Sequence, residues 1–366
     1  MCHKPFAGDA TPRVLHSART REQTYMHSTI VVPGLLDWPV LALAAVEKQA
    51  PALARLIAAA SSPGIEEDGL VATACRSCGL AKQQDWPVAP WLARGAGLDP
   101  GGAYWLCAEP ARFIVGRADV RLDGMIDDLD GAETDTLVAA LNAHFADDGV
   151  RFFALRGRAR WFARVEQAPR LVTHPPQVAL GASLAPYLPT GADAARWRRW
   201  QSEVQMLLFE NPVNRGREQS GRVSVDSVWL WGGGTLIERD RPAVRIFANG
   251  GLIGELSRSA GLAPAALPAA LDAAPSGVAR VFWLDAIDAD AAAARLPAVD
   301  RAWMAAAERA LHAGTIDEVE LVIAGHALAL GFRVPRPSLI RRWRSRFSSP
   351  RVAPLLARFA AEAIRS

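Results

Sequence analysis

The sequence predicts an α/β protein, in which a mostly parallel sheet carries helices on both faces and a smaller α+β domain is inserted. Short apolar runs rich in β-branched residues alternate with segments of helical length towards both ends of the chain, a pattern typical of parallel sheets. The chain has 366 residues, half of them hydrophobic. It is therefore long enough for two structural units, or for one domain with a large insertion.

The first expected elements are a strand and a helix. Thr29–Val32 is a β-branched run that precedes Pro33 and Gly34, which predicts a buried strand followed by a tight turn. Residues 41–60 repeat leucine and valine at three- and four-residue spacing among many alanines. This pattern predicts a helix, which Pro51 either interrupts or starts again.

The middle of the chain changes pattern. Tyr104–Pro110 and Val115–Leu122 are expected to be strands, the first of them ending at its proline. Residues 135–145 repeat apolar side chains at helical spacing, whereas 150–155 and 160–165 are typical of a strand pair. This order of elements predicts the inserted α+β domain.

A distinctive segment runs from residue 203 to residue 256. It opens as a helix that Pro212 ends, continues as a polar loop, and then forms a buried strand over residues 223–231. Gly232–Gly234 is expected to end that strand, because three glycines let the backbone turn sharply and approach another group closely.

The last third of the chain returns to alternation. Val244–Phe247, Val278–Leu284 and Val319–Ile323 predict buried strands, and residues 296–313 predict a helix. Residues 331–366 are expected to form a basic helical tail, because residues 333–366 hold nine arginines and one acid. Such a tail is suited to nucleic acid, an anionic membrane surface or an acidic partner, unless its arginine stems only cover apolar surface.

The segment around Pro212 resembles a stretch of the archaeal-type cofactor-independent phosphoglycerate mutases, which belong to the alkaline phosphatase superfamily. It resembles even more closely a bacterial family of regulatory proteins of the RpfE type. The resemblance implies an alkaline-phosphatase-like core. It rests on the following residues: Pro212, Val213, Asn214, Arg217, Gly221, Trp229, Leu230, Trp231 and Gly232.

The resemblance implies four regions. Residues 1–25 are expected to be a disordered leader, or to precede a true start at Met26. Residues 26–106 together with 186–330 form the alkaline-phosphatase-like core in this scheme. Residues 107–185 form the inserted domain, and residues 331–366 form the basic tail.

The resemblance also implies where metal ions would be held. Phosphoryl transfer in this superfamily uses two divalent ions, which need several carboxylates together with neutral imidazoles. We expect that the chain has lost most of these donors, and therefore predict no metal, no other cofactor and no catalytic residue. The vestigial metal positions are Asp37, Asp285, Asp288 and His326.

Anion binding is the remaining expected chemistry. Arginine binds phosphate or carboxylate through a planar fork, and exposed backbone amides add dipoles. The structural alternative is that Arg217 pairs with a local acid such as Asp226, while Trp229 and Trp231 pack in the core. The candidate anion-binding residues are Asn214, Arg215, Arg217, Gly232, Gly233 and Gly234.

Composition limits the setting of the protein. No run of about 18 apolar residues occurs, so no membrane span is expected. No secretory signal is expected, because no apolar stretch precedes a small-residue cleavage site in the given sequence. Cys75 and Cys78 form a single C-x-x-C pair, where a structural zinc site usually needs two such pairs. Reduced cysteines in a cytoplasmic protein are expected.

Three functions therefore compete. The first is a non-catalytic, mutase-like regulatory or ligand-sensing protein whose partner is a phosphorylated small molecule or another protein. The second is an active phosphoglycerate mutase or metal-dependent phosphatase with rearranged ligands. The third is a nucleic-acid-binding regulator that uses the arginine-rich C-terminus, although no helix-turn-helix context accompanies those arginines.

Overall fold

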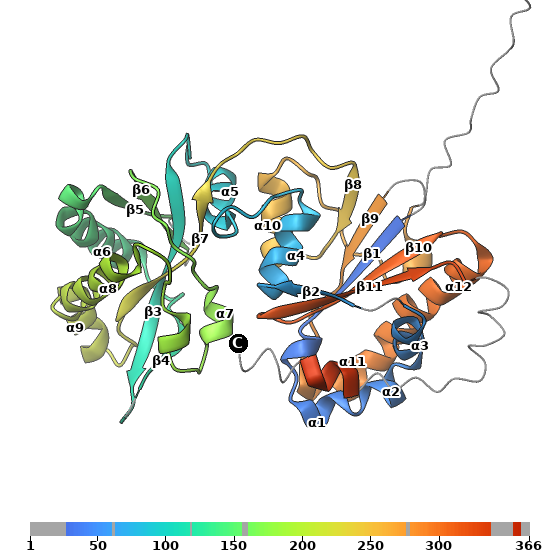
Figure 1. The fold of residues 1–366 in the computed structure, drawn as a ribbon. Helices are drawn as coiled ribbons and strands as arrows, with labels where there is room; N and C mark the ends of the chain where they lie inside the picture. Colours follow the sequence, from blue (N-terminus) through green and yellow to red (C-terminus); the bar gives the residue numbers. More distant parts are fainter. Residues whose placement is uncertain are drawn as a thin grey trace, which may run out of the picture.

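The chain folds into two lobes, each built around its own sheet (Figure 1). The computed structural model describes residues 27–60, 63–117, 119–155, 160–275, 279–337 and 354–359. One lobe contains a six-stranded sheet, and the other contains a five-stranded sheet.

The six-stranded sheet contains the parallel strands that the sequence predicts. Strand β1 pairs in parallel with β10 and β9, and β8 pairs in parallel with β9. Strands β11 and β2 extend the other edge in antiparallel orientation. The mostly parallel sheet is therefore confirmed. Its strands, in sheet order, are β2 (Gly64–Glu67), β11 (Leu328–Pro335), β10 (Glu318–Ala324), β1 (His27–Pro33), β9 (Ala279–Trp283) and β8 (Val244–Phe247).

Helices cover both faces of this sheet, as predicted (Figure 1). Pro51 is the first residue of its helix, so it starts a new helix rather than only interrupting one. The backbone N–H groups of Ala52 and Leu53 donate to the buried Asp300 carboxylate, which satisfies the exposed start of that helix. One face carries α1 (Val40–Leu43), α2 (Val46–Gln49), α3 (Pro51–Ala59), α11 (Ala292–Val299), a π-helical turn (Asp300–Met304) and α12 (Ala305–Ala313), and the other carries α4 (Gly69–Ser77) and α10 (Gly251–Ser259).

The five-stranded sheet is antiparallel and centres on one long strand, β3. The expected pair at residues 150–165 is present as β5 and β6. Strand β3 continues through Pro110, because β3 changes its neighbour from β6 to β4 there and the missing N–H interrupts no pairing on that side. The predicted single strand at 115–122 is wrong, because Val115 ends β3 whereas residues 120–122 begin the antiparallel strand β4. The strands are β3 (Tyr104–Val115), β4 (Val120–Met125), β5 (Val150–Ala154), β6 (Trp161–Val165) and β7 (Ser227–Thr235).

Helices α6, α8 and α9 of the second lobe pack against one face of this sheet around an aromatic core, whereas Ala179 of α7 belongs to the apolar cluster on the other side. The Asp130 side chain accepts from the backbone N–H of Glu133, and the Glu133 side chain accepts from that of Asp130, so α6 begins with a capping box. Helix α5 lies on the other face, towards the first lobe. These helices are α5 (Val88–Gly95), α6 (Gly131–His144), α7 (Pro176–Ala179), α8 (Ala194–Phe209) and α9 (Pro212–Gln219).

The segment around Pro212 differs from the expectation in two ways. Pro212 ends one helix but is also the first residue of α9, so the expected polar loop is largely helical. The Asn211 side chain caps α9 by accepting from the Val213 N–H at 2.9 Å. In addition, β7 includes Gly232–Gly234 and pairs with β3. Residues 194–235, expected in the α/β core, thus lie with the five-stranded sheet.

The expected tail at 331–366 begins inside a strand. Residues Leu328–Pro335 form β11, which pairs with β10, so a helical tail from residue 331 is contradicted. Residues 354–359 are helical, and Leu356 and Phe359 are buried in the first lobe. The expected leader at 1–25 and residues 338–353 and 360–366 lie outside the described residues. Within the described ranges, no helix is long and apolar enough to cross a membrane.

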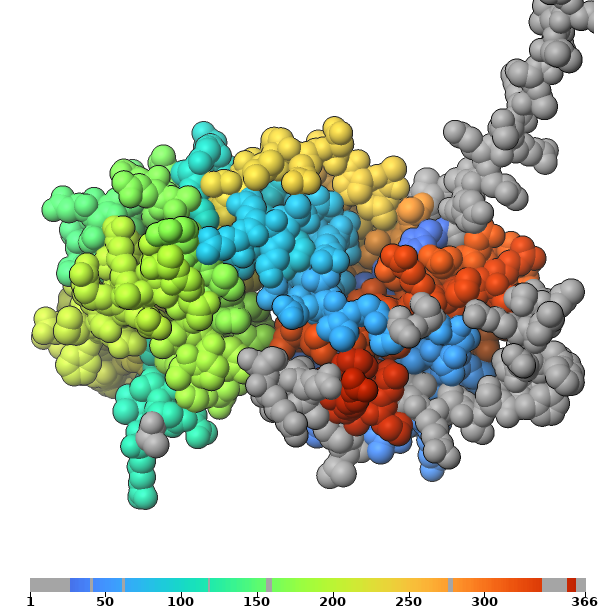
Figure 2. All heavy atoms as spheres, in the orientation of Figure 1, coloured from blue at the N-terminus to red at the C-terminus, as the bar shows by residue number. Residues whose placement is uncertain are grey.

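An apolar cluster joins the two lobes. It includes Val31 and Val281 of the six-stranded sheet as well as Trp105 and Trp229 of the five-stranded sheet. Residues of α4 and α5 fill the region between the lobes in the space-filling view (Figure 2). One continuous core contains side chains from both sheets. Separating the lobes would therefore expose apolar surface to water, which is unfavourable.

A buried carboxylate, Asp85, lies beside this cluster. It accepts from the backbone N–H of Trp86 at 2.8 Å and from the backbone N–H of Thr173 at 3.1 Å, and the Thr173 hydroxyl also donates to it. Burial raises the pKa of Asp85 to about 6, against the lowering effect of these hydrogen bonds. Asp85 thus ties the segment before α5 to the chain that follows β6.

We expect Asp85 to make the protein less stable as the pH rises from about 4 to about 6. The pKa of Asp85 is higher in the folded state, so the unfolded chain loses this proton first, and the ionised form is the one that burial penalises. Asp85→Asn should remove a pH-dependent change in the free energy of unfolding on the order of 3 kcal/mol. Urea unfolding at several pH values measures this free energy, and Asp127→Asn, a substitution of an exposed aspartate, is the control. An unaltered pH dependence in Asp85→Asn would contradict this assignment.

Candidate functional site

Two of the predicted metal positions meet at the carboxyl ends of neighbouring parallel strands. Asp37 follows β1, and His326 follows β10. The Asp37 carboxylate accepts from the backbone N–H of His326 at 2.9 Å, and its other oxygen lies 3.7 Å from His326 Nε2. Ligands in open α/β sheets bind at this edge, because the loops that follow parallel strands converge there. The structure therefore brings Asp37 and His326 together.

The other two predicted metal positions follow β9. Asn249, which follows β8, donates from its side-chain amide to both oxygens of Asp285 at 3.0 and 3.2 Å. Asp288 is exposed just before a 3₁₀ turn. Asp285 thus pairs with the β8 side of the sheet edge, whereas Asp37 pairs with the β10 side. Among the described residues, no group of three or more His, Cys, Asp or Glu side chains is arranged to hold a metal ion.

The backbone packs tightly beside the Asp37–His326 pair. A Cβ atom at Gly325 would lie 2.6 Å from Asp37 Oδ1, and one at Gly69 would lie 2.2 Å from the Gly325 carbonyl oxygen. Gly69 also has φ +44°, which disfavours any other residue. Burial raises the pKa of Asp37, partly offset by the hydrogen bond from His326. The start of α4 is thus fixed against the β10 turn.

Asp68, a residue that the sequence analysis missed, is positioned next to this edge. It has φ 66° and precedes α4. Its carboxylate accepts from Lys82 Nζ at 2.5 Å and from Trp86 Nε1 at 3.0 Å. Burial lowers the pKa of His174, and the charges of Asp68 and Lys82 act on it in opposite directions. The only sequence signal for this group is the Asp-Gly pair before a helix.

The candidate anion-binding residues on α9 are committed to internal contacts. Asn214 is buried, donates to the carbonyls of Leu208 and Val225 and accepts from the Val225 N–H. Arg217 is fully buried and donates to Asp128, to Glu133 at 3.0 Å and to the Val223 carbonyl at 2.6 Å. Arg215 is exposed. The geometry of α9 therefore serves packing, and an anion-binding role for these residues stays a prediction.

The sequence suggested Asp226 as the acid that pairs with Arg217, and this suggestion is wrong. Asp226 instead accepts from the backbone N–H of Phe113 at 2.8 Å and lies 4.0 Å from Arg112. Asp128 and Glu133 reach Arg217 because α6 packs beside α9, a contact between distant parts of the sequence. The expectation that Trp229 and Trp231 pack in the core is confirmed, since both side chains are 3% exposed.

Gly232–Gly234 lie inside β7, where they permit close packing. A Cβ atom at Gly233 would lie 2.2 Å from the Tyr104 hydroxyl oxygen, and one at Gly234 would lie 2.5 Å from the Cβ atom of Pro87. The Gly232 N–H donates to the Thr173 hydroxyl at 3.1 Å. The glycines thus approach other groups closely, as predicted, although the groups they approach belong to this chain.

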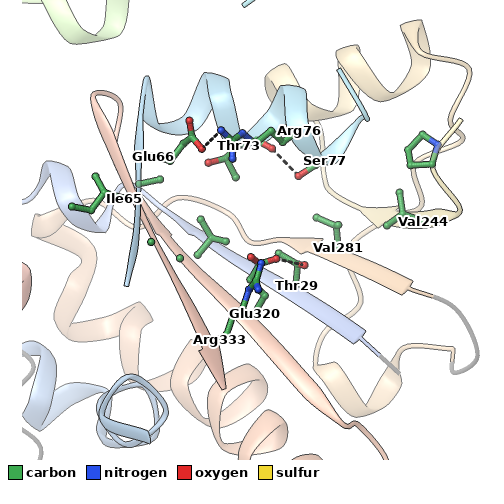
Figure 3. A pocket seen from close by; sticks show the side chains of 15 residues that line it. Thr29, Ile65, Glu66, Thr73, Arg76, Ser77, Val244, Val281, Glu320 and Arg333 are labelled. Carbon is green, nitrogen blue, oxygen red and sulfur yellow. Dashed lines mark hydrogen bonds and ion pairs between the residues drawn. The ribbon is translucent and has the colours of Figure 1, made fainter. Parts of the chain in front are cut away.

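A cavity of about 610 Å³ lies on the face of the six-stranded sheet below α4 (Figure 3). Its floor contains apolar side chains such as Val244 and Val281, while Glu66 and Arg76 pair across its rim at 2.6 Å. Glu320 accepts from the Thr29 hydroxyl at 3.2 Å. These polar groups are therefore paired with one another across the cavity wall.

The fold and the strand-end residues define an α/β protein whose polar side chains gather where such folds bind ligands. No protein-family profile matches the chain. A stretch of 131 residues is 31% identical to 2,3-bisphosphoglycerate-independent phosphoglycerate mutase 2 of Methanothermobacter thermautotrophicus and covers 33% of this chain and 29% of that protein. A stretch of 103 residues is 28% identical to a probable mutase of the same kind from Geobacter sulfurreducens and covers 28% of this chain and 26% of that protein.

Two solved structures are similar at 15% sequence identity. The cofactor-independent phosphoglycerate mutase of Thermoplasma acidophilum gives a TM-score of 0.39 over 86% of this chain and 91% of that chain. A protein of Pyrococcus horikoshii gives a TM-score of 0.42 over 85% and 88%. The chain is distantly homologous to cofactor-independent phosphoglycerate mutases, and the matched stretches span less than a third of the curated relatives.

We expect Arg217→Ala to lower the free energy of unfolding by about 3 kcal/mol, because it empties a fully buried position and removes a cation from the Glu133 carboxylate, which is 11% exposed. The exposed neighbour supplies a matched control, and Arg215→Ala should change stability by no more than about 0.5 kcal/mol. Urea denaturation measures both values. A stable Arg217→Ala variant that no longer binds phosphate would reverse this conclusion and assign the arginine to a ligand.

Proposed function

We propose that this protein is a non-catalytic, phosphoglycerate-mutase-like protein that binds a phosphorylated small molecule and acts as a regulatory or ligand-sensing protein, as the resemblance to the RpfE type implies. The observation that carries the proposal is the pairing at the strand ends. Asp37 bonds to His326, and Asp285 bonds to Asn249. The homology to mutases supports a phosphorylated ligand.

A two-metal site needs negative charge gathered at one point. Two divalent cations held a few ångströms apart need several anionic oxygen donors converging on them. The acids at this edge instead lie in two separate pairs, and no described cluster gathers three metal-type side chains. Ser61 and Ser62, which do not match the superfamily's nucleophile context in sequence, lie outside the described residues.

An active mutase or phosphatase with rearranged ligands is the second candidate. The observation that favours it is the proximity of Asp37 and His326, a carboxylate and an imidazole at the same sheet edge. Asp68 lies at the adjacent start of α4, which packs on the turn that holds His326. A metal-induced shift of these side chains would be needed to bring three donors to one point.

Metal content and turnover decide between the two candidates. We expect the purified protein, incubated with Mn²⁺ and dialysed, to retain far less than one ion per chain. We also expect 3-phosphoglycerate to raise the melting temperature without being converted to 2-phosphoglycerate. The Methanothermobacter mutase, treated in parallel, controls for the assay. A stoichiometric ion together with turnover that His326→Ala abolishes would establish the enzyme instead.

A further inference from the structure

A second cavity, of about 660 Å³, lies between the lobes where α5 and α10 face β3 and β6. None of the strand-end residues described above lines it. Its walls combine apolar side chains, among them Leu92, Leu155 and Phe162, with a small set of charged ones. Cavities of this size with a mainly apolar wall and a few placed polar groups are typical of small-molecule sites.

The charged set centres on Arg160. Its Nε donates to the carboxylate of Glu109 at 3.2 Å, and its Nη1 donates to the carboxylate of Glu255. Glu109 is only 8% exposed, and burial raises its pKa against the lowering effect of Arg160. One guanidinium therefore bridges two acids from different lobes, and both carboxylates are hydrogen-bonded to it.

Arg258 lines the same cavity from the last turn of α10. No described residue accepts a hydrogen bond from its guanidinium or forms an ion pair with it. With two glutamates and two arginines on the wall, the formal charges cancel, and Arg258 is the one of these four side chains that bonds to none of the others. A guanidinium with free N–H groups beside an apolar wall suits a carboxylate or phosphate.

The neighbouring residues keep this position open. A Cβ atom at Gly95 would lie 2.0 Å from the Ser259 hydroxyl oxygen, so glycine is what allows α5 to approach α10 here. Ser259 and Arg258 therefore face the cavity without an intervening side chain from α5. This close approach is an observation about packing, independent of the charge argument.

We propose that this cavity binds a small amphipathic anion, a carboxylate or phosphate carried on an apolar body, with Arg258 holding the anionic group. The apolar body lies against Leu92 and Phe162. The site is separate from the strand ends, so the proposal goes beyond the proposed function and stands without it.

Calorimetric titration with three probes tests the proposal. Phenyl phosphate and benzoate carry the two anionic groups on an apolar ring, and inorganic phosphate lacks the ring. We expect one or both ring probes to bind more tightly than inorganic phosphate, and the tighter of the two identifies the anionic group. Arg258→Ala should weaken that probe about tenfold, because a charge-assisted hydrogen bond is lost, and Arg258→Lys should weaken it less.

Arg301→Ala, at an exposed arginine on the π-helical turn, is the matched control and should bind like the wild type. Melting temperatures show that each variant is folded. Equal affinity of the wild type and Arg258→Ala, or no binding of any probe by the wild type, would overturn the proposal. The proposed function is tested by metal content and mutase turnover, whereas this proposal is tested by the affinity of the three probes. A failure of one is therefore distinguishable from a failure of the other.

Discussion

The packing of β7 on β3 is the constraint on which the rest of the structure depends. It places Trp229 and Trp231 in the core that both lobes share. It is possible only because Gly232–Gly234 leave room for Tyr104, Pro87 and Val88, which approach β7 from two sides. With larger residues there, the segment before α5 could not lie against the sheet. Asp85 and Thr173, which bond to this region, would lose their positions as well.

The packing around β7 also positions polar groups near the strand ends of the six-stranded sheet. Trp86 follows Asp85 and donates to Asp68, while Trp229 donates to the carbonyl of His174. The second lobe thereby holds polar groups next to the carboxyl edge of the parallel strands. Among the described residues, this edge carries two separate polar pairs, Asp37 with His326 and Asp285 with Asn249.

The two lobes also meet at the cavity around Arg160, and the chemistry there differs from that of the strand ends. Glu109 comes from the second lobe and Glu255 from the first, and one guanidinium bonds to both. Breaking such a buried charge arrangement is costly, because an unpaired charge would remain in a poorly solvated place. Arg160 therefore links the lobes electrostatically on the side where α5 and α10 pack together.

The sequence by itself determined the alternation of strands and helices, the parallel core and the burial of the tryptophans, because each follows from local apolar periodicity. It also placed Asp37 and His326 at strand ends, and the topology then brought them together. Only the tertiary structure decided that Arg217 meets Asp128 and Glu133 across some 85 residues of sequence, and that β7 joins the second sheet. Local patterns carry no information on which distant acid or strand is the partner, since that choice depends on how whole elements pack.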